Sequence, residues 1–264
     1  GQINVQVEGG CPTKIIRRIN SYEDLFILKS EREAMNNYYG IDMIHTTLVI
    51  PCMFGQRSDK RFQEGESFGL KIITDFINSM NFNKVKIFDP HSDVTLALVN
   101  NSVKISSFEY IQETILELSR LGMKTTKSLT LVSPDAGAYK KVFKYGEDLN
   151  LPLVAANKFR DLEGKITLNI LGDVKDKECL IVDDLLDGGY TFILLAQQLR
   201  LQGASKVFLY ISHGMFSKGY KELEKHLDGI YCTNSYKEEY FYDSMECGEQ
   251  GVKPKFLTIL KFVD

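Results

Sequence analysis

Residues 179–192 read CLIVDDLLDGGYTF and contain four structural signals in direct succession. The first four residues form a short apolar run, typical of a strand that is buried on both faces. Asp183 and Asp184 close this strand, and Asp187–Gly189 then turn the chain. Thr191 leads into a segment with the apolar periodicity of a helix. We therefore expect a strand, an acidic pair, a tight glycine turn and a helix N-terminus.

Such a succession is suited to a phosphorylated sugar. The N–H groups of the turn and the positive end of the helix dipole can bind a phosphate group. The two acids can face ribose hydroxyls or a metal ion. An Asp-Gly-Gly sequence also occurs in ordinary tight turns. Two acids at the carboxyl end of a buried strand favour the ligand-binding interpretation, because ligands of parallel sheets collect there.

The composition excludes several classes of protein. The chain has 264 residues, enough for two compact domains or one large domain. It is 44% hydrophobic and 25% charged with a net charge of −3, which argues against nucleic acid as a partner. No apolar run approaches the roughly 20 residues that cross a bilayer, and no leader-like segment begins the sequence, so we expect no membrane partner and a cytoplasmic location. The five cysteines lack any C-x-x-C pair, which speaks against structural zinc and a disulfide framework.

Strand-like and helix-like segments alternate along the whole chain. Apolar runs of strand length occur at 26–28, 48–51, 85–88, 129–132, 153–156, 180–182 and 207–211. Helical patterns occur at 67–80, 107–121, 139–149, 191–202 and 218–226. This alternation predicts an α/β fold, with mainly parallel sheets flanked by helices. The spacing indicates two such units that divide near residue 107, and the sequence PKFLTILKFVD at 254–264 resembles a last edge strand.

Polar residues follow the expected strands in the first half of the chain. After the strand at 48–51, four charged residues occupy five positions, namely Arg57, Asp59, Lys60 and Arg61. They suit polyphosphate binding, with a solvated charged loop as the alternative. The next strand is followed by Asp89-Pro90-His91. A histidine beside acids suits metal ligation or phosphate contact, although a loop histidine without a role is also possible.

The strands of the second half end in similar chemistry. One is followed by Asp135 and a glycine ahead of a helix, and the next by Lys158 and Arg160. Because these two cations are two positions apart, they face the same way if the chain is extended. The sequence contains neither a G-x-x-x-x-G-K-[ST] loop nor a G-x-G-x-x-G turn after a strand, so phosphate would be bound by another kind of loop.

Taken in order, these segments resemble the phosphoribosyl pyrophosphate synthetases (ribose-phosphate diphosphokinases), which belong to the wider type I phosphoribosyltransferase fold. The resemblance runs from about Gly1 to about residue 217. The segments that match are 51–61 (ATP loop), 89–91 (D-L-H), 133–137 (S-P-D-x-G), 158–160 (mobile catalytic loop), 169–174, 182–191 (ribose 5-phosphate loop) and 212–214.

The resemblance implies two type I phosphoribosyltransferase-like domains, an ATP-binding one at 1–107 and a sugar-phosphate-binding one at 108–264. It implies transfer of the diphosphoryl group of ATP to the 1-hydroxyl of ribose 5-phosphate with Mg²⁺, in a homo-oligomer. The implied roles are catalysis for Lys158 and Arg160; sugar binding for Asp183, Asp184, Asp187, Gly188, Gly189, Tyr190 and Thr191; ATP binding for Arg57, Asp59 and His91; and magnesium binding for His91 and Asp135.

The sugar-phosphate loop departs from the family pattern D-T-x-G-T. A hydroxyl is lost at Gly188 and an aromatic ring appears at Tyr190. Extra space and a stacking surface would suit a larger group on the phosphate, so ADP-ribose, converted to its 1-pyrophosphate for NAD salvage, is an alternative acceptor. A phosphoribosyltransferase and a non-catalytic regulatory subunit are further alternatives.

Overall fold

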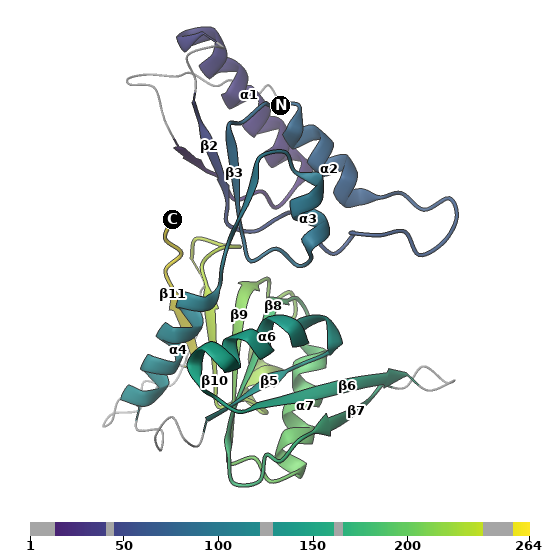
Figure 1. Ribbon diagram of the computed structural model, residues 1–264, viewed down its shortest axis with the longest axis vertical. Coiled ribbons are helices and arrows are strands. Elements are labelled where there is room, and N and C mark those ends of the chain that lie inside the picture. Colours follow the sequence, from purple (N-terminus) through teal and green to yellow (C-terminus); the bar gives the residue numbers. More distant parts are fainter. Residues whose placement is uncertain (1–13, 41–44, 122–128, 161–165, 240–255) are drawn as a thin grey trace. The chain divides into compact units, whose positions relative to one another are not determined.

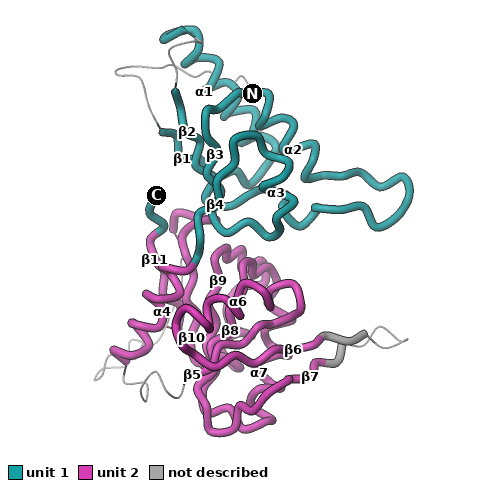
Figure 2. The backbone as a smooth tube through the Cα atoms, viewed as in Figure 1, with its two compact units in different colours: residues 1–107, 262–264 teal, residues 108–261 magenta. Residues whose placement is uncertain are grey.

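The computed structural model describes residues 14–40, 45–121, 129–160, 166–239 and 256–264, and only the backbone of 158–160 and 166–167. The chain forms two compact units, which Figure 2 shows in different colours. Unit 1 contains the described residues up to Ser107 together with Phe262–Asp264, and unit 2 contains Phe108–Lys261. Within the described residues, no helix is both long enough and apolar enough to cross a membrane.

Unit 1 is built on a parallel sheet with the strand order β1-β2-β3-β4; Figure 1 labels β2 and β3, and Figure 2 labels all four strands. Its strands are β1 (Lys14–Ile16), β2 (Thr47–Ile50), β3 (Lys84–Phe88) and β4 (Ser102–Ile105). Its helices are α1 (Tyr22–Tyr39), α2 (Gly69–Asn78) and α3 (Asp93–Leu98). Leu48, Ile50 and Ile87 of the two central strands are fully buried in the core of this unit.

Helix α1 replaces the strand that we expected at 26–28. The Oγ atom of Ser21 accepts a hydrogen bond from the Asp24 N–H at 3.1 Å and so caps the helix. The buried residues of α1 are spaced by three and four positions, at Leu25, Leu28, Arg32 and Met35. The run Phe26-Ile27-Leu28 is therefore one turn of an amphipathic helix, and the strand prediction at this point is wrong.

Unit 2 contains a sheet with the order β11-β10-β9-β8-β5-β6-β7. Its strands are β5 (Leu129–Ser133), β6 (Leu153–Arg160), β7 (Ile166–Leu171), β8 (Glu178–Leu186), β9 (Lys206–Gly214), β10 (Gly229–Thr233) and β11 (Leu257–Leu260). Its helices are α4 (Phe108–Arg120), α6 (Ala136–Leu149), α7 (Tyr190–Leu201) and α8 (Lys221–Glu224).

All neighbouring strands of unit 2 run parallel except β6 and β7. Cys179 and the three residues after it lie in the middle of this sheet and are fully buried, as a strand covered on both faces requires. Strand β11 lies at the edge, where the sequence predicted a final strand. The prediction of an α/β fold with mainly parallel sheets is confirmed.

The last three residues differ from the expected domain division, which assigned 108–264 to one domain. The Phe262 ring packs against Phe88, with ring centroids 4.9 Å apart. The Asp264 carboxylate accepts hydrogen bonds from Lys86 at 2.7 Å and Lys14 at 3.3 Å. An aromatic contact and two ion pairs therefore place these residues in unit 1.

Candidate functional site

Strand β8 extends beyond the acidic pair that was expected to close it. In the ladder with β9, Asp183 lies opposite Ile211 and Leu186 lies opposite Gly214. The strand is longer than its apolar run because β9 continues beside it and supplies hydrogen-bonding partners. The acids therefore lie within a paired strand, on a rigid part of the fold, and the turn at Asp187 follows them.

Gly189 fixes the conformation of the turn between β8 and α7. Its φ angle is +80°, a region that side chains with a Cβ disfavour, and an added Cβ would lie 2.9 Å from Leu223 Cδ2. Its carbonyl oxygen accepts hydrogen bonds from the Phe192 and Ile193 N–H groups, both at 3.1 Å. The first turn of α7 therefore begins directly after this glycine.

The N–H groups of this turn are available to an anion. Among the described residues, the N–H groups of Gly188, Gly189 and Tyr190 have no hydrogen-bond acceptor. N–H groups at a helix N-terminus lack intrahelical partners, and the helix dipole adds a positive potential there. The turn predicted from the sequence thus presents three backbone N–H groups that can donate to one anion. The Tyr190 side chain is 61% exposed beside it.

The acidic pair has an unusual electrostatic setting. Asp184 is buried and Asp183 is half-buried, with its Oδ1 atom accepting a hydrogen bond from the Asp184 N–H at 2.9 Å. Burial and the neighbouring Asp184 carboxyl raise the pKa of Asp183 well above its ordinary value, while the Lys141 ammonium on α6 lowers it. Hydroxyl donors of a ligand, or a bound cation, would stabilise the ionised Asp183 carboxylate and so offset the cost of burying its charge. A carboxyl that served only a turn would gain no such compensation, so this setting favours a ligand site.

Asp135 lies after β5, the strand beside β8. Val132 pairs with Ile181 in that parallel ladder, so the chain leaves both strands at the same edge of the sheet. The Asp135 Oδ1 atom accepts a hydrogen bond from the Ala138 N–H at 3.0 Å and caps α6. The residue itself is exposed. The structure thus brings Asp135 to the edge that carries the acidic pair.

Strand β6 continues to Arg160, beyond the expected end at residue 156. Lys158 pairs with Leu168 and Arg160 with Ile166 in the antiparallel ladder with β7. The side chains of Lys158 and Arg160 lie outside the described part of the structure, so their catalytic role stays a prediction.

In unit 1, the Gln56 side chain joins the two segments expected to bind ATP. Gln56 is 2% exposed, and its Oε1 atom accepts a hydrogen bond from the His91 N–H at 2.9 Å. Arg57 and His91 are exposed and Asp59 is half-buried. Because β2 and β3 are adjacent and parallel, the two segments leave the same edge of the sheet. The structure thus brings the expected ATP-binding segments together.

Comparisons with known proteins find similar sequences. Residues 131–248 match the model of the phosphoribosyl synthetase-associated domain. The chain is 32% identical over 197 residues to a ribose-phosphate pyrophosphokinase of Mycoplasma genitalium, which covers 72% of this chain. It is 28% identical over 228 residues to ribose-phosphate pyrophosphokinase 2 of Schizosaccharomyces pombe, covering 81% of this chain and 70% of that protein. This chain is similar in sequence to the phosphoribosyl pyrophosphate synthetases.

A solved structure of a family member shares the fold. Phosphoribosylpyrophosphate synthetase from Mycobacterium smegmatis superposes with a TM-score of 0.75 at 20% identity, covering 96% of this chain and 78% of that one. The chain spans 58% of the length of the Mycoplasma genitalium relative. The likeness therefore establishes a type I phosphoribosyltransferase-like fold.

The residues expected to hold magnesium lie in different units, His91 in unit 1 and Asp135 in unit 2. Across the described ranges, no three His, Cys, Asp or Glu side chains lie close enough to hold a metal ion by themselves. Mg²⁺ usually keeps several waters and binds one or two carboxylates with substrate phosphates. The exposed carboxylate of Asp135 fits that requirement.

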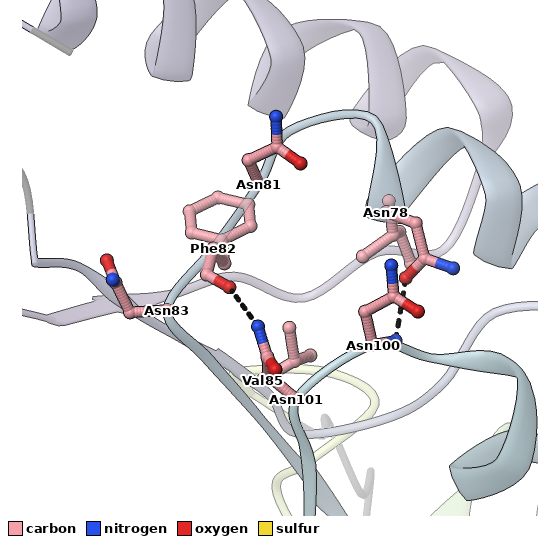
Figure 3. A pocket seen from close by; sticks show the side chains of 8 residues that line it. Asn78, Asn81, Phe82, Asn83, Val85, Asn100 and Asn101 are labelled. Carbon is pink, nitrogen blue, oxygen red and sulfur yellow. Dashed lines mark hydrogen bonds between the residues drawn. The ribbon is translucent and has the colours of Figure 1, made fainter. Parts of the chain in front are cut away.

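A hollow in unit 1 lies away from these segments (Figure 3). It is lined by residues at the amino ends of β3 and β4, whereas the ATP-binding segments follow the carboxyl ends of β2 and β3. The Asn101 side chain donates to the Phe82 carbonyl at 3.1 Å, and the Asn78 side chain accepts from the Asn100 N–H at 2.8 Å. These carboxamides stabilise turns of the backbone, so we assign the hollow no role in the site.

Sequence reasoning missed two lysines of unit 2. Lys141 acts on Asp183 from α6, and its position could have been found, because it follows Ala138 by three residues on the face that packs against the sheet. Lys218 lies against Gly188, thirty positions earlier in the sequence. No local sequence pattern connects Lys218 with Gly188, because only the parallel pairing of β8 and β9 brings the two residues together.

Proposed function

We propose that this chain transfers the β,γ-diphosphoryl group of ATP to the 1-hydroxyl of ribose 5-phosphate, giving phosphoribosyl pyrophosphate and AMP. The observation that carries the proposal is the direct succession of the acidic pair, the donor turn and the α7 N-terminus on the central strand of unit 2. The names of its relatives support the same reaction.

The sugar is held through both of its ends. Its 5-phosphate accepts hydrogen bonds from the N–H groups of Gly188, Gly189 and Tyr190, in the positive potential of α7. Its 2- and 3-hydroxyls donate to the carboxylates of Asp183 and Asp184. These neutral donors stabilise the charged form of Asp183, which burial disfavours.

ATP is bound by unit 1 through Arg57, Asp59 and His91. The Arg57 guanidinium can form two parallel hydrogen bonds to phosphate oxygens, a geometry that lysine cannot offer. The hydrogen bond from the His91 N–H to the Gln56 side chain holds the two loops together. His91 and Asp135 would hold Mg²⁺, which would supply positive charge to the phosphate oxygens.

The reaction itself is mostly positioning and charge neutralisation. The oxygen of the 1-hydroxyl forms a bond to the β-phosphorus, the bond between that phosphorus and the α,β-bridging oxygen breaks, and AMP leaves. The hydroxyl proton passes to solvent. Lys158 and Arg160 neutralise the charge that develops on the transferring group, an effect of about 3 kcal/mol per donor in well-organised sites.

ADP-ribose is not favoured as the acceptor. Its case rested on extra space at Gly188 and on a stacking surface at Tyr190. The Lys218 side chain lies against Gly188 and limits that space, whereas Tyr190 is exposed. The relatives named above are ribose-phosphate pyrophosphokinases. A homo-oligomer stays a prediction, which light scattering of the purified chain would check.

Mass spectrometry of reaction products tests the proposal. The purified full chain is incubated with ATP and Mg²⁺ plus either ribose 5-phosphate or ADP-ribose. We expect AMP and phosphoribosyl pyrophosphate from the first mixture and little AMP from the second. A third mixture, phosphoribosyl pyrophosphate with purine bases, detects a phosphoribosyltransferase. Products in the third mixture alone, or no product in any mixture, would contradict the proposal.

A further inference from the structure

The side chain of Lys218 lies along Gly188 in the sugar-phosphate turn. A Cβ built on Gly188 would lie 3.5 Å from Lys218 Cδ, 3.6 Å from Cε and 3.8 Å from Cγ, all ordinary van der Waals distances. The aliphatic stem of Lys218 therefore lies in van der Waals contact with the position that a Cβ at residue 188 would take. The ammonium is one bond beyond Cε and thus remains beside the turn.

The loop that carries Lys218 is fastened to the turn. The Met215 N–H donates to the Leu186 carbonyl at 2.7 Å, and the Ser217 N–H donates to the Asp187 carbonyl at 3.1 Å. The buried Phe216 ring anchors the same loop on unit 2. These contacts, made to the two residues before Gly188 and next to Lys218, fix the backbone from which the lysine extends.

The charge of Lys218 is not used elsewhere in the described structure. The residue is exposed, and within the described ranges its ammonium forms no hydrogen bond and no ion pair. The nearby N–H groups of Gly188, Gly189 and Tyr190 also lack acceptors there. An exposed cation on a fastened loop, next to a row of backbone donors, is a suitable partner for a dianion.

We propose that Lys218 binds the 5-phosphate of the acceptor sugar. Its positive charge takes the place of the side-chain hydroxyl that the turn lacks at Gly188. The inference rests on the proposed function and adds a specificity-determining residue to it. The γ atoms of a threonine at 188 would extend beyond a Cβ that already contacts the Lys218 stem, so we expect the stem to move aside for them. A hydroxyl at 188 and this position of Lys218 therefore compete for one space.

Calorimetric titration of ribose 5-phosphate into the full chain tests the proposal. We expect Lys218→Ala to raise the Kd at least tenfold and Lys218→Arg to change it less than threefold. Lys206→Ala is the matched control, because Lys206 begins β9 at the end of the strand opposite to the loop. The control should change the Kd less than twofold. Circular dichroism melting verifies that each variant is folded.

A double variant tests whether a hydroxyl at residue 188 can replace the ammonium of Lys218. Gly188→Thr alone should weaken binding, because its side chain displaces Lys218. Gly188→Thr combined with Lys218→Ala should bind better than Lys218→Ala alone, since the hydroxyl then has room to reach the phosphate. A double variant that binds ribose 5-phosphate no better than Lys218→Ala would refute the claim that a hydroxyl at residue 188 can replace the Lys218 ammonium.

The outcomes separate this inference from the proposed function. Should the unmodified chain bind ribose 5-phosphate while Lys218→Ala and Lys206→Ala bind it equally well, the role of Lys218 is refuted and the proposed function stands. Should the unmodified chain bind no ribose 5-phosphate and form no AMP, both are refuted.

Discussion

Asp183 has an environment that differs clearly from that of an ordinary surface acid. It is half-buried, it touches the backbone of Asp184, and burial together with the Asp184 carboxyl raises its pKa well above the usual 3.8. In the folded state it therefore holds its proton to higher pH than in the unfolded state. The free energy of unfolding must then fall as the pH rises from about 4 through the folded-state pKa.

Removing this carboxyl tests the point. We expect Asp183→Asn to be more stable than the unmodified chain at neutral pH without ligand, with the difference vanishing near pH 4. Urea unfolding at several pH values measures it, and Asp148→Asn, at an exposed position near the end of α6, is the control. The same variant should lose most affinity for ribose 5-phosphate. Equal pH profiles of Asp183→Asn and the unmodified chain would contradict this account.

In our proposal, Lys158 acts in the chemical step and not in the binding of ATP. We expect Lys158→Ala to lower kcat about a hundredfold or more, as loss of one charge-stabilising donor does in other enzymes, while the Kd for ATP changes less than twofold. Steady-state kinetics and equilibrium binding measure the two quantities. Lys144→Ala, at an exposed position on α6, is the matched control. An unchanged kcat in Lys158→Ala would remove this residue from the mechanism.

At the scale of single residues, the sequence identified those whose neighbours in the chain reveal their role. Asp183, Asp184 and Gly189 stand next to one another in a strand–turn–helix pattern. Lys218 could not be found in that way, because its partner Gly188 belongs to a different loop. The contact of the Lys218 stem with Gly188 could not be predicted for the same reason.

At the scale of elements, the turn between β8 and α7 holds two glycines with different requirements. Gly189 has a φ angle of +80° and a Cβ there would approach Leu223 to 2.9 Å, whereas Gly188 has neither constraint. We expect Gly189→Ala to cost about 1 to 3 kcal/mol of stability and to weaken sugar-phosphate binding. Gly188→Ala, the neighbouring control, should cost less than about 0.5 kcal/mol. Thermal unfolding compares the two variants, and equal losses would contradict the assigned turn geometry.

Element boundaries were least predictable where tertiary contacts set them. Strand β8 reaches Leu186 because β9 runs beside it to Gly214. The run at 26–28 satisfied a strand pattern, but the cap at Ser21 and the spacing of buried residues make it helical. The long periodic segments behind α2, α4 and α7 were predicted to within a few residues, because their apolar stripes extend over several turns.

At the scale of the whole molecule, the two units hold different ligands in our proposal. We expect His91→Ala to raise the Kd for ATP about tenfold and to leave ribose 5-phosphate binding unchanged. Asp184→Ala should do the reverse. Titrating each ligand into each variant separately measures all four values. Loss of ATP binding in Asp184→Ala, without unfolding, would contradict the division of roles between the units.

The division of the chain was visible in the sequence as two successive sets of alternating strands and helices. The position of Phe262–Asp264 in unit 1 was not, because it depends on the Phe88 ring and on Lys14 and Lys86, far away in the chain. Catalysis requires that the ligands of both units meet, and this requirement is the central claim of the proposal.

A crystal structure of the chain with ribose 5-phosphate, Mg²⁺ and a non-hydrolysable ATP analogue tests that claim most directly. The account predicts the 5-phosphate within hydrogen-bonding distance of the Gly188–Tyr190 N–H groups and the ribose hydroxyls on Asp183 and Asp184. The 1-hydroxyl should face the β-phosphorus of the nucleotide, which is bound at Arg57 and His91. A sugar phosphate bound away from the β8–α7 turn, or a 1-hydroxyl directed away from the nucleotide, would contradict it.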